Sequence, residues 1–176
     1  MFEEIHYLKK GTAKQRKAYL TLQQIRIMEE LAHYTPLLCG TIPIGIDLLD
    51  ADLDIIVEVH LFHIFESEVK KLYGHLDTFK INKGRDYMTV SFYYNGFMIE
   101  IFAQNKAVKE QNAYLHMIIE WCLIEKWPFL KEEVIDLKKK GLKTEPAFCK
   151  LLNLKGDDPY LMLLEYGEKL DIISKQ

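Results

Sequence analysis

The sequence predicts an α+β fold in which a mixed β-sheet is flanked by helices and followed by a C-terminal helical region. Two observations carry this prediction. A helical pattern comes first and short strand-like runs then recur up to residue 104, whereas only helical patterns follow that point. We therefore expect residues 1–104 to form the sheet-bearing region and residues 105–176 a helical region packed on it, as one compact unit.

The composition is that of an ordinary globular protein, with 49% hydrophobic and 28% charged residues in 176. The net charge is −3, and acidic and basic residues are interspersed, which argues against a broad basic surface for extended nucleic acid. The chain has no apolar leader at its start and no run of 18 apolar residues. We expect a cytoplasmic protein that makes no contact with a membrane.

Three cysteines, Cys39, Cys122 and Cys149, are widely spaced and form no CxxC pair. An odd number at such spacing suggests neither a disulfide framework nor a zinc ribbon. We interpret them as reduced thiols of the core.

The first helix is predicted over residues 14–31, because apolar residues recur there at intervals of three and four. They are Ala18, Leu22, Ile25, Met28 and Leu31. Basic side chains crowd the beginning of this stretch, and we favour a solvated basic surface over a phosphate contact, since charge runs usually face water. They are Lys9, Lys10, Lys14, Arg16 and Lys17.

Two strands and a helix are predicted next, over residues 34–39, 53–59 and 62–76. The second strand is apolar on both faces after Asp54, as expected of a central strand covered on both sides. Three further strands follow at 78–82, 87–94 and 97–103. The last two are joined by Asn95-Gly96, a dipeptide that suits a type I′ hairpin.

Helices are predicted for the rest of the chain, over 108–126 and 130–140. Thr144 begins a third, with Pro146 in its first turn. Asp158-Pro159 opens a fourth that runs to about residue 166.

The candidate catalytic residues are three acids on two of the predicted strands. Side chains alternate along a strand, so Asp52 and Asp54 share a face, with Cα atoms about 6.6 Å apart. Glu100 interrupts an otherwise apolar run, and a buried carboxylate normally needs a cation or a hydrogen-bond partner. If the two strands are neighbours, the three acids meet and suit Mg²⁺. Alternatively, Glu100 pairs with an arginine or lies on an exposed face; we favour the metal.

Gly40 and Thr41 precede Asp52 by ten residues. A glycine allows close approach of backbone N–H groups to a phosphate, and the threonine adds a hydroxyl. In front of two paired aspartates, this combination indicates a triphosphate-binding turn.

The segment Cys39-Gly40-Thr41, the ten-residue gap and Asp52-Leu53-Asp54-Ile55 together resemble the motif of nucleotidyltransferases of the DNA polymerase β type. More closely, GTIPIGID with DLDI, and EIFAQ with QNAYLHM, resemble an uncharacterised bacterial domain family of that superfamily. The close resemblance covers most of the chain, with its strong motifs at 38–57 and 98–117. Two departures are Thr41 in place of the usual Ser and Glu100 in place of the commoner Asp.

The resemblance implies a nucleotidyltransferase-like catalytic region at 1–104. Its activity would be Mg²⁺-dependent transfer of a nucleoside monophosphate from a triphosphate, such as ATP, to an acceptor hydroxyl on a small molecule, protein or RNA. Asp52 and Asp54 would hold two ions, and Glu100 would bind the one that activates the acceptor. Gly40 and Thr41 would cradle the phosphates. The alternatives are a non-catalytic nucleotide-binding protein and an antitoxin-like interaction protein with the same fold.

A polar stripe on the predicted helix after the Glu100 strand is a further candidate. Asn112, His116 and Glu120 are four residues apart and share one face. We favour Asn112 and His116 slightly as nucleotide contacts because they lie in the family-like run, although a stripe facing water explains the spacing equally well. His60 and His63 could form a metal pair, but without a nearby third ligand we interpret them as incidental.

Overall fold

The computed structural model describes residues 2–174 and contains one five-stranded sheet with the order β1-β2-β5-β4-β3. The pair β2 and β5 is parallel, and the other three pairs are antiparallel. This confirms the predicted α+β fold with a mixed sheet. The strands are β1 Leu37–Cys39, β2 Leu53–Glu58, β3 Lys80–Lys83, β4 Tyr87–Tyr94 and β5 Phe97–Gln104.

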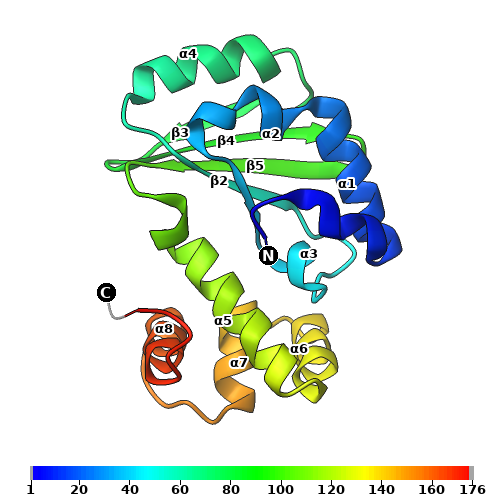
Figure 1. The fold of residues 1–176 in the computed structure, drawn as a ribbon, viewed down its shortest axis with the longest axis vertical. Helices are drawn as coiled ribbons and strands as arrows, with labels where there is room; N and C mark the ends of the chain where they lie inside the picture. Colours follow the sequence, from blue (N-terminus) through cyan, green and yellow to red (C-terminus); the bar gives the residue numbers. More distant parts are fainter. Residues whose placement is uncertain (1, 175–176) are drawn as a thin grey trace.

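Helices cover both faces of this sheet (Figure 1). The α-helices are α1 Ala13–Ile25, α2 Ile27–Glu30, α3 Thr41–Ile44, α4 Phe62–Tyr73, α5 Asn112–Lys126, α6 Phe129–Lys139, α7 Thr144–Leu151 and α8 Pro159–Lys169. Short 3₁₀ segments are η1 Ile5–Lys10, η2 Ala32–Tyr34 and η3 Val108–Glu110. In Figure 1, α2 and α4 lie above the sheet, α1 runs along its right-hand end, and α5 to α8 lie below it.

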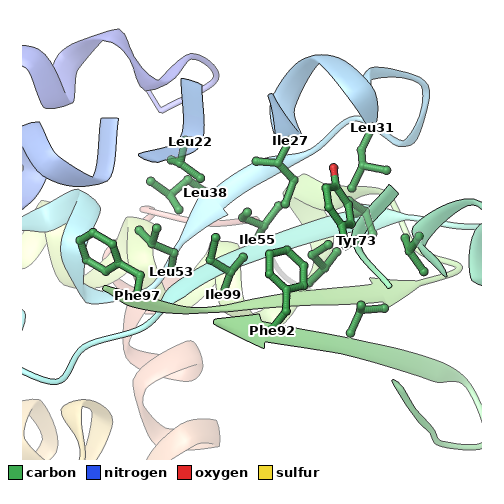
Figure 2. Close-up of a cluster of buried hydrophobic side chains, with 14 of the residues drawn as sticks. Leu22, Ile27, Leu31, Leu38, Leu53, Ile55, Tyr73, Phe92, Phe97 and Ile99 are labelled. Atoms are coloured by element: carbon green, nitrogen blue, oxygen red, sulfur yellow. The ribbon is translucent and has the colours of Figure 1, made fainter. Parts of the chain in front are cut away.

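The upper layer is a core between the sheet and the first helices. Alternate residues of the central strands point into it, including Ile55 of β2 and Ile99 of β5, both with no exposed surface. Figure 2 shows Leu22, Ile27 and Leu31 from the helices facing these strand residues across the layer. The spacing that predicted the first helix includes Leu22 and Leu31 but not Ile27, because the break at Arg26 changes the helical register.

The lower layer is a second core, in which the C-terminal helices contact the opposite face of the sheet. Ile56 is 1% exposed and packs here, whereas its neighbour Ile55 packs in the upper core. Leu37 and Cys39 of β1 join the same cluster, together with residues of α5 to α8. The predicted burial of this central strand on both faces is confirmed.

Three backbone positions shift the element boundaries from those predicted. Arg26 has a φ of 56° and divides the predicted first helix into α1 and α2. Thr78 has a φ of 59°, so that β3 begins only at Lys80. Gln111 is extended and separates η3 from α5, where one continuous helix was predicted. None of these residues is Gly or Pro, so the sequence carries no strong local signal for the breaks.

Other expectations concern the hairpin and the thiols. Asn95 and Gly96 have φ values of 48° and 84°, which confirms the positive-φ hairpin between β4 and β5.

All three cysteines are free; Cys39 and Cys149 are buried and Cys122 is half-buried. Within residues 2–174, no helix has the length and apolar character needed to cross a bilayer.

We predict that Ile56→Ala lowers the free energy of unfolding by about 2–5 kcal/mol, because it leaves a cavity between β2 and the C-terminal helices. The control is Ile64→Ala, since Ile64 is 48% exposed and its loss should change stability by less than about 0.5 kcal/mol. Urea unfolding followed by circular dichroism and by the fluorescence of Trp121 and Trp127 measures both. Separate midpoints for the two signals would contradict a single cooperative unit.

Candidate active site

The parallel pairing of β2 with β5 places Asp54 directly beside Glu100, since these two residues are partners in the register. Both share the strand parity of Ile56 and Phe102, which face the lower core, so their side chains lie on that face of the sheet. The condition set by the sequence, that the two acid-bearing strands be neighbours, is met.

Asp52 lies just before β2 instead of within it, and it is exposed. It still belongs to the same group of charges. Burial, followed by the nearby charges of Asp52 and Glu100, raises the pKa of Asp54 to about 6. Burial and the Asp52 charge likewise raise the pKa of Glu100. The structure thus brings the three predicted acids into one negatively charged group.

No basic side chain compensates these acids: within residues 2–174, none of the three forms an ion pair. The arginine partner considered for Glu100 is therefore absent from the described part of the chain. Glu100 is exposed and only partly desolvated, so the expectation of a buried carboxylate is wrong, and the alternative that placed it on an exposed sheet face is met. Its face of β5 lines a cleft, where water reaches the carboxylate.

Gly40 lies against the second aspartate at the end of β1. Its φ is 79° and its ψ is −156°, a conformation open mainly to glycine. A Cβ at this position would overlap Oδ2 of Asp54. Thr41 follows at once as the first residue of the one-turn helix α3, so the predicted Gly-Thr turn adjoins the acids as expected from the sequence.

Two lysines hold the loop that leads from α3 to Asp52. Nζ of Lys14 donates to the carbonyl oxygens of Leu48 and Leu49, the latter at 2.9 Å, and pairs with Asp47 at 3.5 Å. Nζ of Lys138 donates to the carbonyl oxygen of Ile46 at 2.8 Å. Lys14 therefore positions the loop of the candidate site, and the interpretation of this basic residue as merely solvated is wrong.

A cleft of about 640 Å³ lies between the sheet and the C-terminal helices. One wall carries Asp54, Glu100 and the Gly-Thr turn, and the other is formed by α5 and the start of α7. Its lining includes Gly40, Thr41, Asp54, Glu100, Gln104, Lys106, Gln111, Asn112, His116, Glu120, Thr144 and Glu145. A cleft of this volume accommodates a small-molecule ligand.

The polar stripe on α5 faces this cleft and not bulk water. Asn112 is exposed at the cleft, whereas His116 and Glu120 are buried. Gln111 begins this wall and donates from Nε2 to the carbonyl oxygens of Val57 and Lys106, at 3.0 and 2.9 Å. The sequence left open whether this stripe contacts a nucleotide or faces water, and the structure places its three residues on the wall of the cleft.

A group that could hold a metal ion is found on the helical wall. His116, Glu120 and Glu145 each offer a ligand atom, and these atoms lie within 4.8 Å of one another. Among residues 2–174, the three predicted acids do not form such a tight group. Glu145 was not among the residues predicted from the sequence, because α7 meets α5 only through the tertiary fold and no spacing links them. His60, by contrast, pairs with Glu58 at the surface, at 3.1 Å.

Comparison with known proteins identifies a family but no activity. The model of the domain of unknown function DUF4269 matches residues 20–166, which include both motif segments. No curated protein matches the chain.

The fold is similar to those of several solved structures, among them two nucleotide-transferring enzymes. One is the Cid1 poly(U) polymerase bound to Mg 3′-dATP, with a TM-score of 0.58, 14% identity and coverage of 72% of this chain and 41% of that chain. A cytoplasmic RNA terminal U-transferase matches with a TM-score of 0.55 and 14% identity, over 72% of this chain and 39% of that chain. A chain of the GLD-2/RNP-8 complex matches with a TM-score of 0.59 and 12% identity, over 100% of this chain and 74% of that chain.

At such identities the likeness concerns the fold. The chain also spans only about two fifths of the length of the Cid1 and terminal U-transferase chains. With residues 20–166 matched by its model, the chain belongs to the DUF4269 family, and its fold is that of the nucleotidyltransferases.

Proposed function

We propose that this protein is a Mg²⁺-dependent nucleotidyltransferase that moves a nucleoside monophosphate from a nucleoside triphosphate to an acceptor hydroxyl. The observation that carries the proposal is the pairing of Asp54 with Glu100 across parallel strands, with Gly40 against Asp54. A nucleotide has a cleft to enter, because these residues line the space beneath the sheet.

The donor set fits magnesium. Its members are carboxylate oxygens, the ligands that this hard cation prefers, and no described cationic side chain pairs with them. We assign two ions to them, because the three acids do not form the tight group that one ion would need, and two-metal sites spread their ligands over ions about 3.5–4 Å apart. Bound Mg²⁺ would supply charge neutralisation at the phosphates and polarisation of the acceptor oxygen.

The residues divide the reaction between them. Asp52 and Asp54 would hold the ions, and the N–H groups and hydroxyl of Gly40 and Thr41 would bind the β- and γ-phosphates. The acceptor oxygen forms a new bond to the α-phosphorus while the bond to the bridging oxygen breaks and pyrophosphate leaves. Glu100 would bind the ion beside the acceptor and take the hydroxyl proton, for which its exposure to the cleft suits it.

We also propose that Asn112 and His116, on the helical wall of the cleft, contact the nucleotide. Asn112 is exposed there and presents an amide that can donate and accept. His116 lies one turn further along α5 and lines the same space.

RNA is included among the acceptors to be tested. The similar structures include a poly(U) polymerase and an RNA terminal U-transferase, and Cid1 has been captured with the short product ApU. The charge balance of this chain argued only against extended nucleic acid; a short 3′ end needs fewer phosphate contacts. A free 3′-hydroxyl therefore stands beside small molecules and proteins as a candidate.

We predict that Asp54→Asn lowers the rate of nucleotide transfer at least about 100-fold. The change removes a carboxylate proposed to hold the Mg²⁺ ions that stabilise the charge on the reacting phosphates. The measurement is pyrophosphate release and label transfer from each α-labelled triphosphate with Mg²⁺, offered short RNA, small hydroxyl compounds and a fractionated lysate. Asp157→Asn, at an exposed loop residue, is the matched control and should retain the wild-type rate. Equal labelling by wild type and Asp54→Asn would sink the proposal, as would no labelling and no triphosphate binding by wild type.

The pKa of Asp54 predicts a pH-dependent effect on the stability of the metal-free protein. The folded value is about 6, against about 3.9 for an unfolded aspartate. The folded state binds the proton more tightly than the unfolded state, so the protonated carboxyl stabilises the fold. This contribution is complete below pH ~4 and is lost as the pH rises through 6. Ionisation in the folded state therefore costs up to about 3 kcal/mol at pH 8.

In chelator, Asp54→Asn should therefore melt several degrees above wild type at pH 8, and the difference should vanish near pH 4. Thermal melts across this range measure it. An equal difference at both pH values would show that the carboxyl charge is not the cause.

We predict that Gly40→Ala abolishes the stabilisation of the protein by Mg-triphosphate, because the added Cβ overlaps Asp54 Oδ2. Gly141→Ala is the matched control, since Gly141 also has a positive φ, of 95°, but nothing lies within 4 Å of the added carbon. Both variants carry backbone strain of about 1–3 kcal/mol. Thermal shift with and without ligand separates that strain from the contact: loss of the ligand effect in both variants, or in neither, contradicts the assignment.

A further inference from the structure

The wall of the cleft opposite the sheet contains a compact group of ligand-type side chains. His116 and Glu120 are four residues apart on α5 and therefore on one face. Glu145 reaches them from the first turn of α7. One ligand atom from each lies within 4.8 Å of the other two, so that a single ion could contact all three after small side-chain adjustments.

The burial of this group needs an explanation. His116 is 7% exposed and Glu120 only 3%. Nδ1 of His116 has no hydrogen-bond partner among residues 2–174, although an unpaired buried polar atom costs about 1–3 kcal/mol. Glu120 is buried near a second carboxylate, Glu145, which makes ionisation less favourable still. A protein retains such an arrangement at a cost in stability, and a ligand that binds these atoms recovers that cost.

We propose that His116, Glu120 and Glu145 form a binding site for a divalent transition-metal ion of the zinc class. An imidazole nitrogen favours zinc and similar ions over magnesium, which prefers oxygen ligands only. One nitrogen and two carboxylate oxygens also leave a coordination position for water or for a molecule in the cleft, as in zinc sites with three protein ligands.

The protonation states of the metal-free group agree with this assignment. Burial lowers the pKa of His116 to about 4, so the imidazole is neutral at pH 7, the form that binds metals. Burial and the charge of Glu145 raise the pKa of Glu120, opposed by Lys138. A divalent ion would offset the two carboxylate charges, which Lys138 and Lys143 do only in part.

This site is distinct from the one formed by the strand acids, although His116 is also a proposed nucleotide contact and both sites line one cleft. The charges that act on Asp54 are those of Asp52 and Glu100, whereas those that act on Glu120 are Glu145 and Lys138. The two groups lie on opposite walls of the cleft, one on the sheet and one on α5 and α7. The inference does not depend on nucleotidyl transfer, and either site can exist without the other.

The test is a titration of the full chain, stripped of metal by a chelator, with Zn²⁺ alone in calorimetry and with Co²⁺ in visible spectroscopy. We expect one zinc equivalent to bind, and His116→Ala and Glu120→Gln each to weaken its affinity at least about 10-fold. Asp54→Asn and His60→Ala are the controls: the first removes a strand acid, the second an exposed histidine, and both should bind as wild type does.

Folding is checked separately, because Glu120 is buried. Glu120→Gln keeps the shape of the side chain, and Glu145→Gln, at a less buried position, gives a second variant if the first does not fold. Zinc should raise the melting temperature of wild type but not that of Glu145→Gln. A folded Glu145→Gln protein that zinc stabilises as much as wild type contradicts the proposal.

Three other results overturn it. These are unchanged affinity in both His116→Ala and Glu120→Gln, loss of zinc binding in Asp54→Asn, or a cobalt–thiolate charge-transfer band, which would identify a cysteine ligand. Zinc binding without any nucleotide transfer would overturn only the proposed function, and transfer without zinc binding only this inference.

Discussion

The parallel pairing of β2 with β5 is the constraint on which the rest of this structure depends. Parallel neighbours cannot be joined by a tight turn, so the chain must cross over between them. It does so through α4, β3 and β4, which bring β5 back in the same direction beside β2. That crossover brings Glu100 next to Asp54 although 46 positions separate them in the sequence. The acids meet because of the sheet topology and not because of local spacing.

The loop in front of β2 depends on side chains from distant parts of the chain. Lys14 of α1 and Lys138 of α6 donate to its carbonyl oxygens from two different elements. Such bonds fix a segment that has no regular structure of its own, and they replace hydrogen bonds that its backbone would otherwise make with water. The position of Asp52 is thus set jointly by the first helix and by the C-terminal helices.

Much of this arrangement could be predicted from the sequence where the signals are local. Asn95-Gly96 specified its hairpin, and the apolar run after Asp54 specified a central strand. The left-handed residue Arg26 carried no such signal, because an arginine rarely adopts that conformation; the break places Ile27 of α2 in the upper core. Glu145 was missed for a related reason: its neighbours in space belong to another helix, and nothing in the local pattern of α7 indicates them.

The central strand divides its side chains between two cores, and this links the far wall of the cleft to folding. Ile56 and Cys39 pack in the same core as the helices that form that wall. Replacing that wall would uncover apolar surface on the sheet. A change in the shape of the cleft must therefore preserve the packing beneath the sheet, and a foreign helical region joined to this sheet would need a matching apolar face.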